Sequence, residues 1–564
     1  MSDWDYSTDF LVVGSGGGGM TGAITAHDRS AAVLILEKTD RYGGSTTLSG
    51  GVIWVPNNHL MKAAGIEDSE AEAWEYLHAV TAGEVCERRL RSYIRYAPEM
   101  VQTLETQGDV RYGAATTYMD YYPELPGAKR GGRSLDPEPF SARRLRGLAD
   151  LQRRSKQGDV LRFSVTAREG RALVNFNWKS WLFLIKRLVL FYLDIPSRLQ
   201  GRPDNRMTLG RSLGGQLRYA VMRRNIPLWL NTRLLELVVS DGAVTGAVVE
   251  KEGTKMRLQA RKGVLLAAGG FDHNQQMREQ YHPDSWRPGW SAGNPANTGD
   301  AILAGQAVGA AVEFMHCAWW TPTYKMPDGR ADALIAGKSM PGSIFVNQAG
   351  QRFTNEAAPY EDVTKGQFEA HSGSAASVPC YMVFDATYRR KYPIGPIGPA
   401  KAMPDEMIPA DLKRMNFLRR AATLRELAEQ LGIDADGLEA TVARVNGFAA
   451  SGRDLDFGRG DSLHDRYYSD PAVSPNPNLA ALAQGPFYAI EILAGDLGTK
   501  GGLKADAWGR VLDQQDQTIT GLYAAGNCSG SVMGNSYPGA GSTIGPAMTF
   551  AWLAARHATG DALQ

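Results

Sequence analysis

The chain has 564 residues, of which 43% are hydrophobic and 21% charged, and its net charge is +1; this composition is ordinary for a globular protein with two or three packed domains. Its 63 glycines make up about one residue in nine, well above the usual share of roughly 7%, which indicates tight turns or backbone packed against a ligand. Four scattered cysteines and an acidic start without an apolar leader argue against a disulfide framework, a metal site and secretion, and favour a cytoplasmic protein.

A dinucleotide-binding unit is predicted at the beginning of the chain. Residues 9–14 (DFLVVG) are typical of a buried strand, residues 14–19 (GSGGGG) follow, residues 20–27 predict a helix, and residues 32–36 (AVLIL) predict a second strand that ends at Glu37. In such a unit the glycines allow a sharp turn and bring backbone N–H groups close to a pyrophosphate at the helix N-terminus. Glu37 lies 23 positions after the first glycine, where it is placed to bind a ribose hydroxyl.

Further glycine-rich segments indicate that the dinucleotide is FAD. They are residues 38–47 (KTDRYGGSTT), 49–51 (SGG), 263–270 (GVLLAAGG), 521–527 (GLYAAGN) and 542–548 (STIGPAM). In this order they resemble the succinate dehydrogenase/fumarate reductase flavoprotein superfamily, whose last helix would point its N-terminal dipole at the flavin and favour the anionic reduced form. The resemblance implies that the FAD is bound by the following residues: Gly14, Ser15, Gly16, Gly17, Gly18, Gly19, Glu37, Lys38, Gly43, Gly44, Ser45, Thr46, Ser49, Gly50, Gly51, Ala268, Gly269, Asp300, Gly526, Asn527, Ser542, Thr543 and Ile544.

One position separates the branches of this superfamily. Fumarate reductases place an arginine, which donates a proton to the dicarboxylate substrate, shortly after an Arg-Phe-x-Asn-Glu segment. Here that segment is residues 352–356 (RFTNE), and the matching position is Tyr360, which cannot hold a carboxylate as an arginine does. Tyrosine at this position, with residues 296–302 (ANTGDAI), 496–503 (DLGTKGGL) and 537–541 (YPGAG), resembles the FAD-dependent 3-ketosteroid Δ1-dehydrogenases over nearly the whole chain.

The resemblance implies a role for each of five residues. The Tyr537 hydroxyl and the Gly541 N–H would bind the C3 carbonyl oxygen of a 3-ketosteroid substrate and stabilise an enolate-like transition state. Tyr360 would take the C2 proton as general base, assisted by a hydrogen bond from another tyrosine. Alignment favours Tyr121 as this helper, and Tyr118 stays a candidate. The C1 hydrogen would leave as hydride to flavin N5, so that a 3-oxo-4-ene becomes a 3-oxo-1,4-diene.

Residues 164–203 form an insertion relative to soluble members of the family. Apolar residues at 178, 181, 182, 185, 188, 189 and 192 follow helical spacing, and the segment is too short and too charged in its middle to cross a bilayer. Residues 143–206 carry 15 Lys and Arg but 5 Asp and Glu. A basic amphipathic helix suits an anionic membrane surface, and resembles the membrane-associated cholest-4-en-3-one Δ1-dehydrogenases, which accept substrates with side chains. A helix packed on the core and a dimer contact are the alternatives.

The expected fold is α/β: a Rossmann-type FAD-binding domain at residues 1–283 and 484–564, interrupted by an α+β catalytic domain at residues 284–483 and extended by the amphipathic helical insertion. We expect a cytoplasmic protein associated peripherally with the inner face of the membrane, a quinone or another electron acceptor as partner, and no nucleic acid, since no reading module accompanies the basic segment. Two other functions stay open. One is a 3-ketosteroid Δ4-(5α)-dehydrogenase with the same cofactor, and the other is a flavin-bound membrane-surface protein without catalysis.

Overall fold

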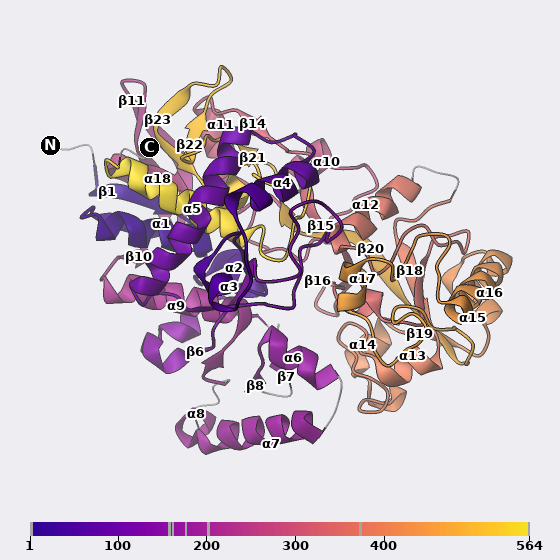
Figure 1. Cartoon of the computed structure of the whole chain (residues 1–564). Coiled ribbons are helices and arrows are strands. Elements are labelled where there is room, and N and C mark those ends of the chain that lie inside the picture. The colour runs from indigo at the N-terminus through magenta and orange to yellow at the C-terminus, as the bar shows by residue number, and fades with distance from the viewer. Residues whose placement is uncertain are drawn as a thin grey trace.

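Two large sheets organise the molecule, as the computed structural model in Figure 1 shows. The structure describes residues 4–155, 159–160, 163–174, 178–199, 204–371 and 375–561, and the side chains of residues 159, 160, 171–174, 178–181 and 196 lie outside this description. The mixed α/β class predicted from the sequence is confirmed.

The first large sheet is built around the beginning of the chain. It has eight strands: β10 (Leu228–Trp229), β2 (Val33–Leu36), β1 (Tyr6–Val13), β13 (Thr254–Leu266), β12 (Ala243–Lys251), β23 (Thr518–Ala524) and β22 (Arg510–Leu512) in this order, with β11 (Thr232–Ser240) pairing with β12. Strand β1 runs parallel to β2 and β13, and β13 runs parallel to β23. The carboxyl ends of these parallel strands therefore meet at one edge, where ligands bind in open α/β sheets.

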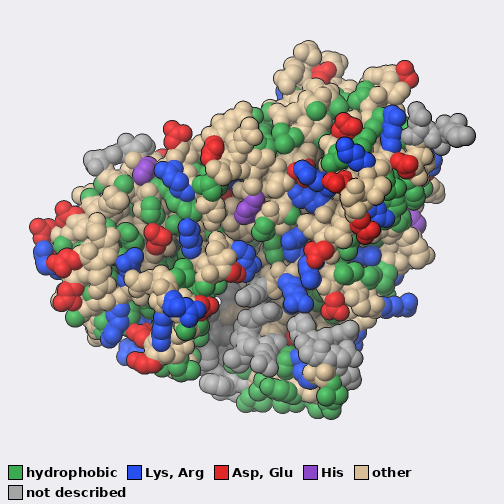
Figure 2. All heavy atoms as spheres, turned by 180° about the vertical axis from the view of Figure 1, so that it is seen from behind, with side chains coloured by type: hydrophobic (Ala, Val, Ile, Leu, Met, Phe, Trp, Pro, Cys, Tyr) green, Lys and Arg blue, Asp and Glu red, His purple; other side chains and the backbone are tan. Residues whose placement is uncertain are grey.

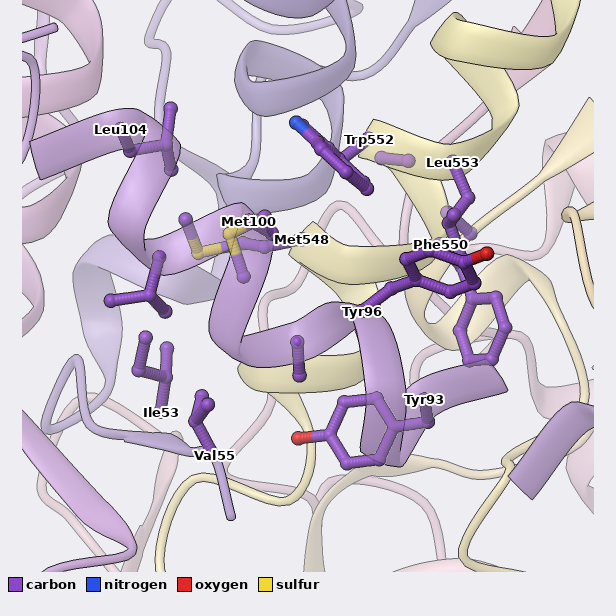
Figure 3. Packing of buried hydrophobic residues seen from close by; sticks show 14 of the residues in the cluster. Ile53, Val55, Tyr93, Tyr96, Met100, Leu104, Met548, Phe550, Trp552 and Leu553 are labelled. Atoms are coloured by element: carbon purple, nitrogen blue, oxygen red, sulfur yellow. The ribbon is translucent and has the colours of Figure 1, made fainter. Parts of the chain in front are cut away.

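Both faces of this sheet are covered, one by helices and the other by strands β11 and β12 together with α11 (Asp300–Ala307). This burial explains why its central strands are continuous apolar runs. Helix α1 (Gly17–Asp28) lies against α18 (Ile544–Ala558), so the first and last helices of the domain are neighbours (Figure 1). Helix α5 (Glu87–Thr106) also packs on α18. In Figure 3 the side chains of Tyr93, Tyr96 and Met100 on α5 meet Met548 and Phe550 on α18, all of them buried.

Shorter elements complete the FAD-binding part. Helix α9 (Leu209–Arg223) packs on α1 and on α2 (Gly44–Leu48), and α11 packs on β11. Met277 of α10 (Gln275–Tyr281) belongs to the buried cluster on one face of the first sheet, and α4 (Glu70–Thr81) packs on α5. A small sheet joins β3 (Ile53–Trp54), β5 (Ser134–Pro137) and β4 (Tyr112–Ala114).

The second large sheet is antiparallel. Its order is β16 (Ala331–Ala333), β15 (Ala318–Lys325), β20 (Phe487–Thr499), β18 (Cys380–Phe384) and β17 (Ser343–Val346), with β19 (Arg419–Ala421) pairing with β20 as the sixth strand. Helices α12 (Tyr360–His371), α15 (Leu424–Leu431) and α16 (Ala435–Ser451) pack around it. Strand β20 falls within the range 484–564 that we assigned to the FAD-binding domain, and the chain rejoins the first sheet only after this strand. The domain limits at 284 and 484 stay a prediction.

That residues 164–203 are an insertion relative to soluble members of the family stays a prediction. The described residues among them form a lobe beside α9 and below the first sheet in Figure 1. It contains α6 (Ala167–Val174), α7 (Trp178–Leu193) and α8 (Ile195–Leu199), and a small buried cluster of Phe163, Val165 and Phe191 holds α7 to strand β8 (Phe163–Ser164). The side chains of Trp178 and Trp181, part of the predicted apolar stripe, lie outside the described residues. Among the described residues, no helix has the length and apolar character needed to span a membrane.

Candidate active site

The glycine-rich turn between β1 and α1 brings backbone close to backbone. Gly14 has φ of +110°, and a Cβ at this position would lie 2.3 Å from the carbonyl oxygen of Ala267 at the end of β13. Only glycine fits such a contact without strain. The Gly17 N–H at the start of α1 donates to the Thr46 hydroxyl at 2.9 Å, so the segment after Glu37 folds back over the turn. This cradle of backbone at a helix N-terminus suits a pyrophosphate.

Glu37 is buried at the end of β2, and protein hydroxyls fix its carboxylate. The Ser15 hydroxyl donates to it at 2.5 Å and the Thr39 hydroxyl at 2.9 Å. Its neighbour Lys38 donates to Asp300 Oδ2 at 3.0 Å. Two segments more than 250 positions apart, residues 37–38 and 298–300, therefore border the same space.

One cavity of about 1040 Å³ contains most of the predicted cofactor residues and all five of the predicted catalytic residues. This volume is at the upper end of the range of about 300–1,000 Å³ for ligand pockets, as a site for a dinucleotide and a second molecule requires. Three of the predicted cofactor residues are described but do not line it: Gly19, Gly43 and Ser542. Gly43 acts one layer further out, because its N–H donates to the Ser15 hydroxyl at 3.0 Å.

Three tyrosine hydroxyls form a hydrogen-bonded chain at one end of this cavity. The Tyr121 hydroxyl donates to the Tyr360 hydroxyl at 3.3 Å, and the Tyr118 hydroxyl lies 3.3 Å from that of Tyr121. Tyr121 is therefore the direct partner of Tyr360, and Tyr118 is one step removed. The ring of Tyr537 packs at 5.2 Å from that of Tyr360 and 5.3 Å from that of Tyr121, measured between ring centroids.

Burial dominates the electrostatics of this cluster. Removal from water raises the pKa of Tyr360 well above its usual value near 10, because a buried phenolate loses its hydration, while the hydrogen bond with Tyr121 opposes this rise. Burial also raises the pKa of Tyr537, opposed by hydrogen bonds with Tyr360 and Thr543. His464 lies with its ring centroid 5.0 Å from that of Tyr121, and burial lowers its pKa to about 3, so it adds no charge near neutral pH.

Gly541 follows Tyr537 in a turn that packs against strand β3. Its φ is +100°, and a Cβ would lie 2.4 Å from the carbonyl carbon of Ile53 and 2.5 Å from the Trp54 nitrogen. Both Tyr537 and Gly541 line the cavity together with Thr543 and Ile544 from the start of α18. A hydroxyl donor and the amino end of a helix therefore border the same space, which favours a ligand that develops negative charge.

Comparison with known proteins identifies the family. Residues 9–544 match the family described as FAD binding domain. The chain is 39% identical to the 3-oxosteroid 1-dehydrogenase of Mycolicibacterium smegmatis, over 97% of this chain and 96% of that protein, and 40% identical to that of Mycobacterium tuberculosis, over 97% and 98%. The 3-ketosteroid Δ1-dehydrogenase of Sterolibacterium denitrificans, solved in complex with 1,4-androstadiene-3,17-dione, has a TM-score of 0.94 and 44% identity, over 98% of this chain and 99% of that one. This chain belongs to the 3-oxosteroid 1-dehydrogenase family.

Membership of the 3-oxosteroid 1-dehydrogenase family confirms the predicted enzyme class and the FAD cofactor. The residues present fit that cofactor: the Gly14 turn leaves no room for a side chain, and the first turns of α1 and α18 both border the cavity. FAD would lie along the glycine turn, Glu37, Lys38 and the residues 44–51. The roles of single residues in this member of the family stay predictions.

Sequence reasoning missed two polar residues near the cofactor segments. Asn297 donates to the Ser45 hydroxyl at 3.0 Å and to the Asp272 carboxylate at 2.6 Å. Asp272 is buried, and burial together with the charge of Asp496 raises its pKa to about 6. Asn297 belongs to the segment ANTGDAI, and Asp272 follows the glycine pair at 269–270, so both lie within or beside motifs that the sequence analysis used.

A second omission lies at the outer end of the tyrosine chain. The Tyr468 hydroxyl is 3.0 Å from that of Tyr118, and Tyr468 also lines the cavity. Tyr468 is 347 or more positions away from the segment of residues 118–121, and no motif surrounds it, so only the packing of α17 (Leu463–Tyr467) reveals its place.

Gly14→Ala is expected to weaken FAD binding about tenfold or more. A left-handed or similarly strained backbone costs a non-glycine residue about 1–3 kcal/mol, each 1.4 kcal/mol is tenfold in affinity, and the new methyl group would also press on Ala267. The measurement is the flavin content per chain, from the visible absorbance of the purified protein during dialysis. Gly447→Ala in α16 is the control, since nothing lies within 4 Å of its added Cβ. Equal flavin retention in both variants would contradict this account of the turn.

Proposed function

We propose that this protein desaturates 3-ketosteroids between C1 and C2, with Tyr360 as the base that removes the C2 proton. The observation that carries the proposal is the hydrogen bond between Tyr121 and Tyr360 inside the cavity that the glycine turn also lines. The complex of the Sterolibacterium denitrificans enzyme with 1,4-androstadiene-3,17-dione supports the substrate class, because that steroid carries the double bond at C1–C2.

The C3 carbonyl of the substrate would accept hydrogen bonds from the Tyr537 hydroxyl and the Gly541 N–H. Both residues line the cavity, and the close approach of Gly541 to β3 holds its backbone rigidly. Donors placed where charge develops lower the barrier for removing a proton next to a carbonyl, because they stabilise the enolate-like transition state more than the ground state.

Tyr360 would then accept the C2 proton. Its high pKa means that the phenolate is scarce at neutral pH, so a hydrogen bond that favours the phenolate is needed, and Tyr121 is in place to donate it. The C1 hydrogen leaves as hydride, for which bound FAD supplies the acceptor at its N5.

Replacement of the Tyr360 hydroxyl by hydrogen tests the proposed base. Tyr360→Phe is expected to lower the rate of flavin reduction by a 3-oxo-4-ene steroid by about 10²–10⁴-fold, the usual contribution of a general base. The measurement is anaerobic stopped-flow absorbance of the holoenzyme, with the product identified by mass spectrometry and NMR. Tyr381→Phe, on strand β18, is the matched control and should reduce flavin at the wild-type rate.

Three results would contradict the proposal in different ways. A Tyr360→Phe enzyme with the control's rate would remove Tyr360 from the chemistry. A 5α-saturated 3-ketosteroid that gains a C4–C5 double bond would make the protein a Δ4-(5α)-dehydrogenase instead. The absence of flavin bleaching with any 3-ketosteroid would support a flavin-bound protein without catalysis.

The expected pH dependence of kcat/KM follows from the upward shift of the Tyr360 pKa. The base is active as phenolate, and its pKa is raised, so kcat/KM is expected to rise with pH without a plateau below about pH 10. Tyr121→Phe removes the hydrogen bond that lowers this pKa and should move the rising limb to higher pH. The measurement is kcat/KM against pH for both enzymes. An unchanged pH profile of kcat/KM in Tyr121→Phe would show that Tyr121 does not assist the base.

We also propose that α7 and α8 rest on a membrane surface, from which a sterol with an alkyl side chain would enter. The described members of the predicted apolar stripe do not pack on the protein's core: Leu182, Ile185, Leu188, Val189 and Tyr192 are each 41% to 58% exposed. Figure 2 shows hydrophobic side chains gathered along the bottom of the molecule, where Figure 1 places α7 and α8.

Charge and position support this surface. Residues 143–206 carry 15 Lys and Arg against 5 Asp and Glu, which would attract anionic headgroups. Ala167 on α6 lines the cavity, as do Arg154 and Ser155 just before the insertion. Through Ala167 the insertion reaches from the exposed apolar stripe to the wall of the active-site space. For the electron acceptor we propose a quinone, which shares the lipid phase with such a substrate.

A triple substitution tests the membrane surface. Leu182→Glu/Ile185→Glu/Val189→Glu should reduce co-sedimentation with vesicles of anionic lipid at least several-fold, because burying carboxylates in the headgroup region is costly. Flavin reduction by a short, water-soluble 3-ketosteroid should be unchanged. Leu455→Glu, at a side chain that is 72% exposed on the catalytic part, is the control. Equal vesicle binding by all proteins, or loss of a dimer instead of lipid binding, would contradict the proposal.

A further inference from the structure

A fully buried ion pair lies next to the two tyrosines that flank the proposed reaction. Glu361 follows Tyr360 in the first turn of α12, and Lys500 follows the end of β20 in the segment DLGTKGG. Lys500 Nζ is 2.7 Å from Glu361 Oε1, and neither side chain is exposed at all. Breaking such a pair is costly, because one charge stays buried without its partner.

Lysine ammonium groups also bind the backbone that leads into Tyr537. Lys500 Nζ donates to the carbonyl oxygen of Ser536 at 2.9 Å. Lys365 Nζ, one turn after Glu361 on α12, donates to the carbonyl oxygen of Asn535 at 2.5 Å and lies 2.9 Å from Glu361 Oε1. Glu361 therefore pairs with two lysines, and each of these lysines binds one of the two peptide units immediately before Tyr537.

Lys500 also faces Trp319 on β15. Its ammonium lies 4.5 Å from the centroid of the Trp319 ring, and the Trp319 ring packs edge-on at 4.8 Å from that of Tyr537. One ammonium group thus contacts Glu361 beside Tyr360, the backbone before Tyr537 and a ring that packs against Tyr537. Burial lowers the pKa of Lys500, and the negative charge of Glu361 opposes this change.

Neither Lys500, Glu361 nor Lys365 lines the cavity, so these groups act on a ligand through other residues. We propose that Lys500 is a positioning residue, which with Glu361 and Lys365 sets the distance between the Tyr360 hydroxyl and the Tyr537 hydroxyl. This inference rests on the proposed function, in which Tyr360 removes a proton from C2 and Tyr537 binds the neighbouring C3 carbonyl oxygen.

The physical reason is the short distance over which the two tyrosines must cooperate. C2 and C3 are adjacent atoms of one substrate, so the base and the carbonyl donor need a fixed separation for both to act in one transition state. Tyr360 comes from α12 and Tyr537 from the segment after β23, which are separate parts of the chain. The lysine–glutamate cluster is a direct tie between these two parts.

Lys500→Met tests the proposal, because methionine fills similar space and cannot donate. With holoenzyme, the rate of anaerobic flavin reduction per bound flavin by androst-4-ene-3,17-dione should fall about 100-fold, the effect of a displacement of roughly 1 Å in a catalytic group. The steroid concentration giving half the maximal rate should change several-fold at most. The isotope effect with C2-deuterated substrate should increase relative to wild type, because removal of the C2 proton becomes the slower step.

A matched control separates positioning from general damage. Lys504→Met removes a lysine four positions later whose ammonium pairs with Asp516 at 2.5 Å on the surface, and should keep the wild-type rate and isotope effect. Loss of fold alone would lower the fraction of flavin-bound protein without changing the rate per flavin or the C2 isotope effect. Lys500→Met with the rate and isotope effect of Lys504→Met would overturn the proposal.

Two further variants keep the test decisive. If Lys500→Met binds no FAD, Lys365→Met decides the matter: its side chain is 27% exposed, and a wild-type rate and isotope effect in this variant would overturn the proposal. Tyr360→Phe, measured in parallel, distinguishes the two levels of inference. Its failure to slow flavin reduction would refute the proposed function, whereas a slow Tyr360→Phe beside an unaffected Lys500→Met would refute the positioning role alone.

Discussion

Exclusion of water from the tyrosine hydroxyls is the constraint on which the arrangement of this protein depends. At neutral pH little of a phenol with an ordinary pKa near 10 is present as the phenolate base, and burial raises the pKa of Tyr360 further. Neighbouring hydroxyl groups oppose this effect: Tyr121 donates to Tyr360, and Tyr360 and Thr543 lower the pKa of Tyr537. Burial also strengthens each of these interactions, because the local dielectric is lower than in water.

The same constraint explains why distant parts of the chain must meet in positions that can vary little. Strand β20 belongs to the antiparallel sheet, yet the segment that follows it carries Lys500 back to the loop before Tyr537. The glycine turn at Gly14 contacts β13, and Gly541 contacts β3. Each of these contacts is between backbones or fully buried groups, which are close-packed and adjust little. The cofactor segments, Tyr360 as the proposed base and Tyr537 as the proposed carbonyl donor are thereby held in one cavity.

The lobe of α6, α7 and α8 packs differently from the rest of the molecule. Helix α7 buries Phe191 but leaves the described part of its apolar stripe exposed. An apolar side chain that is exposed to water gains no free energy of burial. It gains this free energy when it enters the boundary between lipid headgroups and acyl chains, and neighbouring basic side chains attract anionic headgroups. The contrast with α5 and α18, whose apolar faces meet in the core as in Figure 3, shows that amphipathic spacing alone does not decide what a helix packs against.

The sequence by itself determined the family, the cofactor and the local unit that binds it, because the turn at Gly14, the acid at Glu37 and the tyrosine at position 360 are requirements of chemistry and backbone geometry that short motifs record. Only the tertiary structure decided that Tyr121 rather than Tyr118 contacts Tyr360, that Tyr468 and Asn297 join the cavity, and that Lys500 meets Glu361. These contacts join residues far apart in the chain or choose between neighbours, and side-chain packing in three dimensions, which no local pattern encodes, settles them.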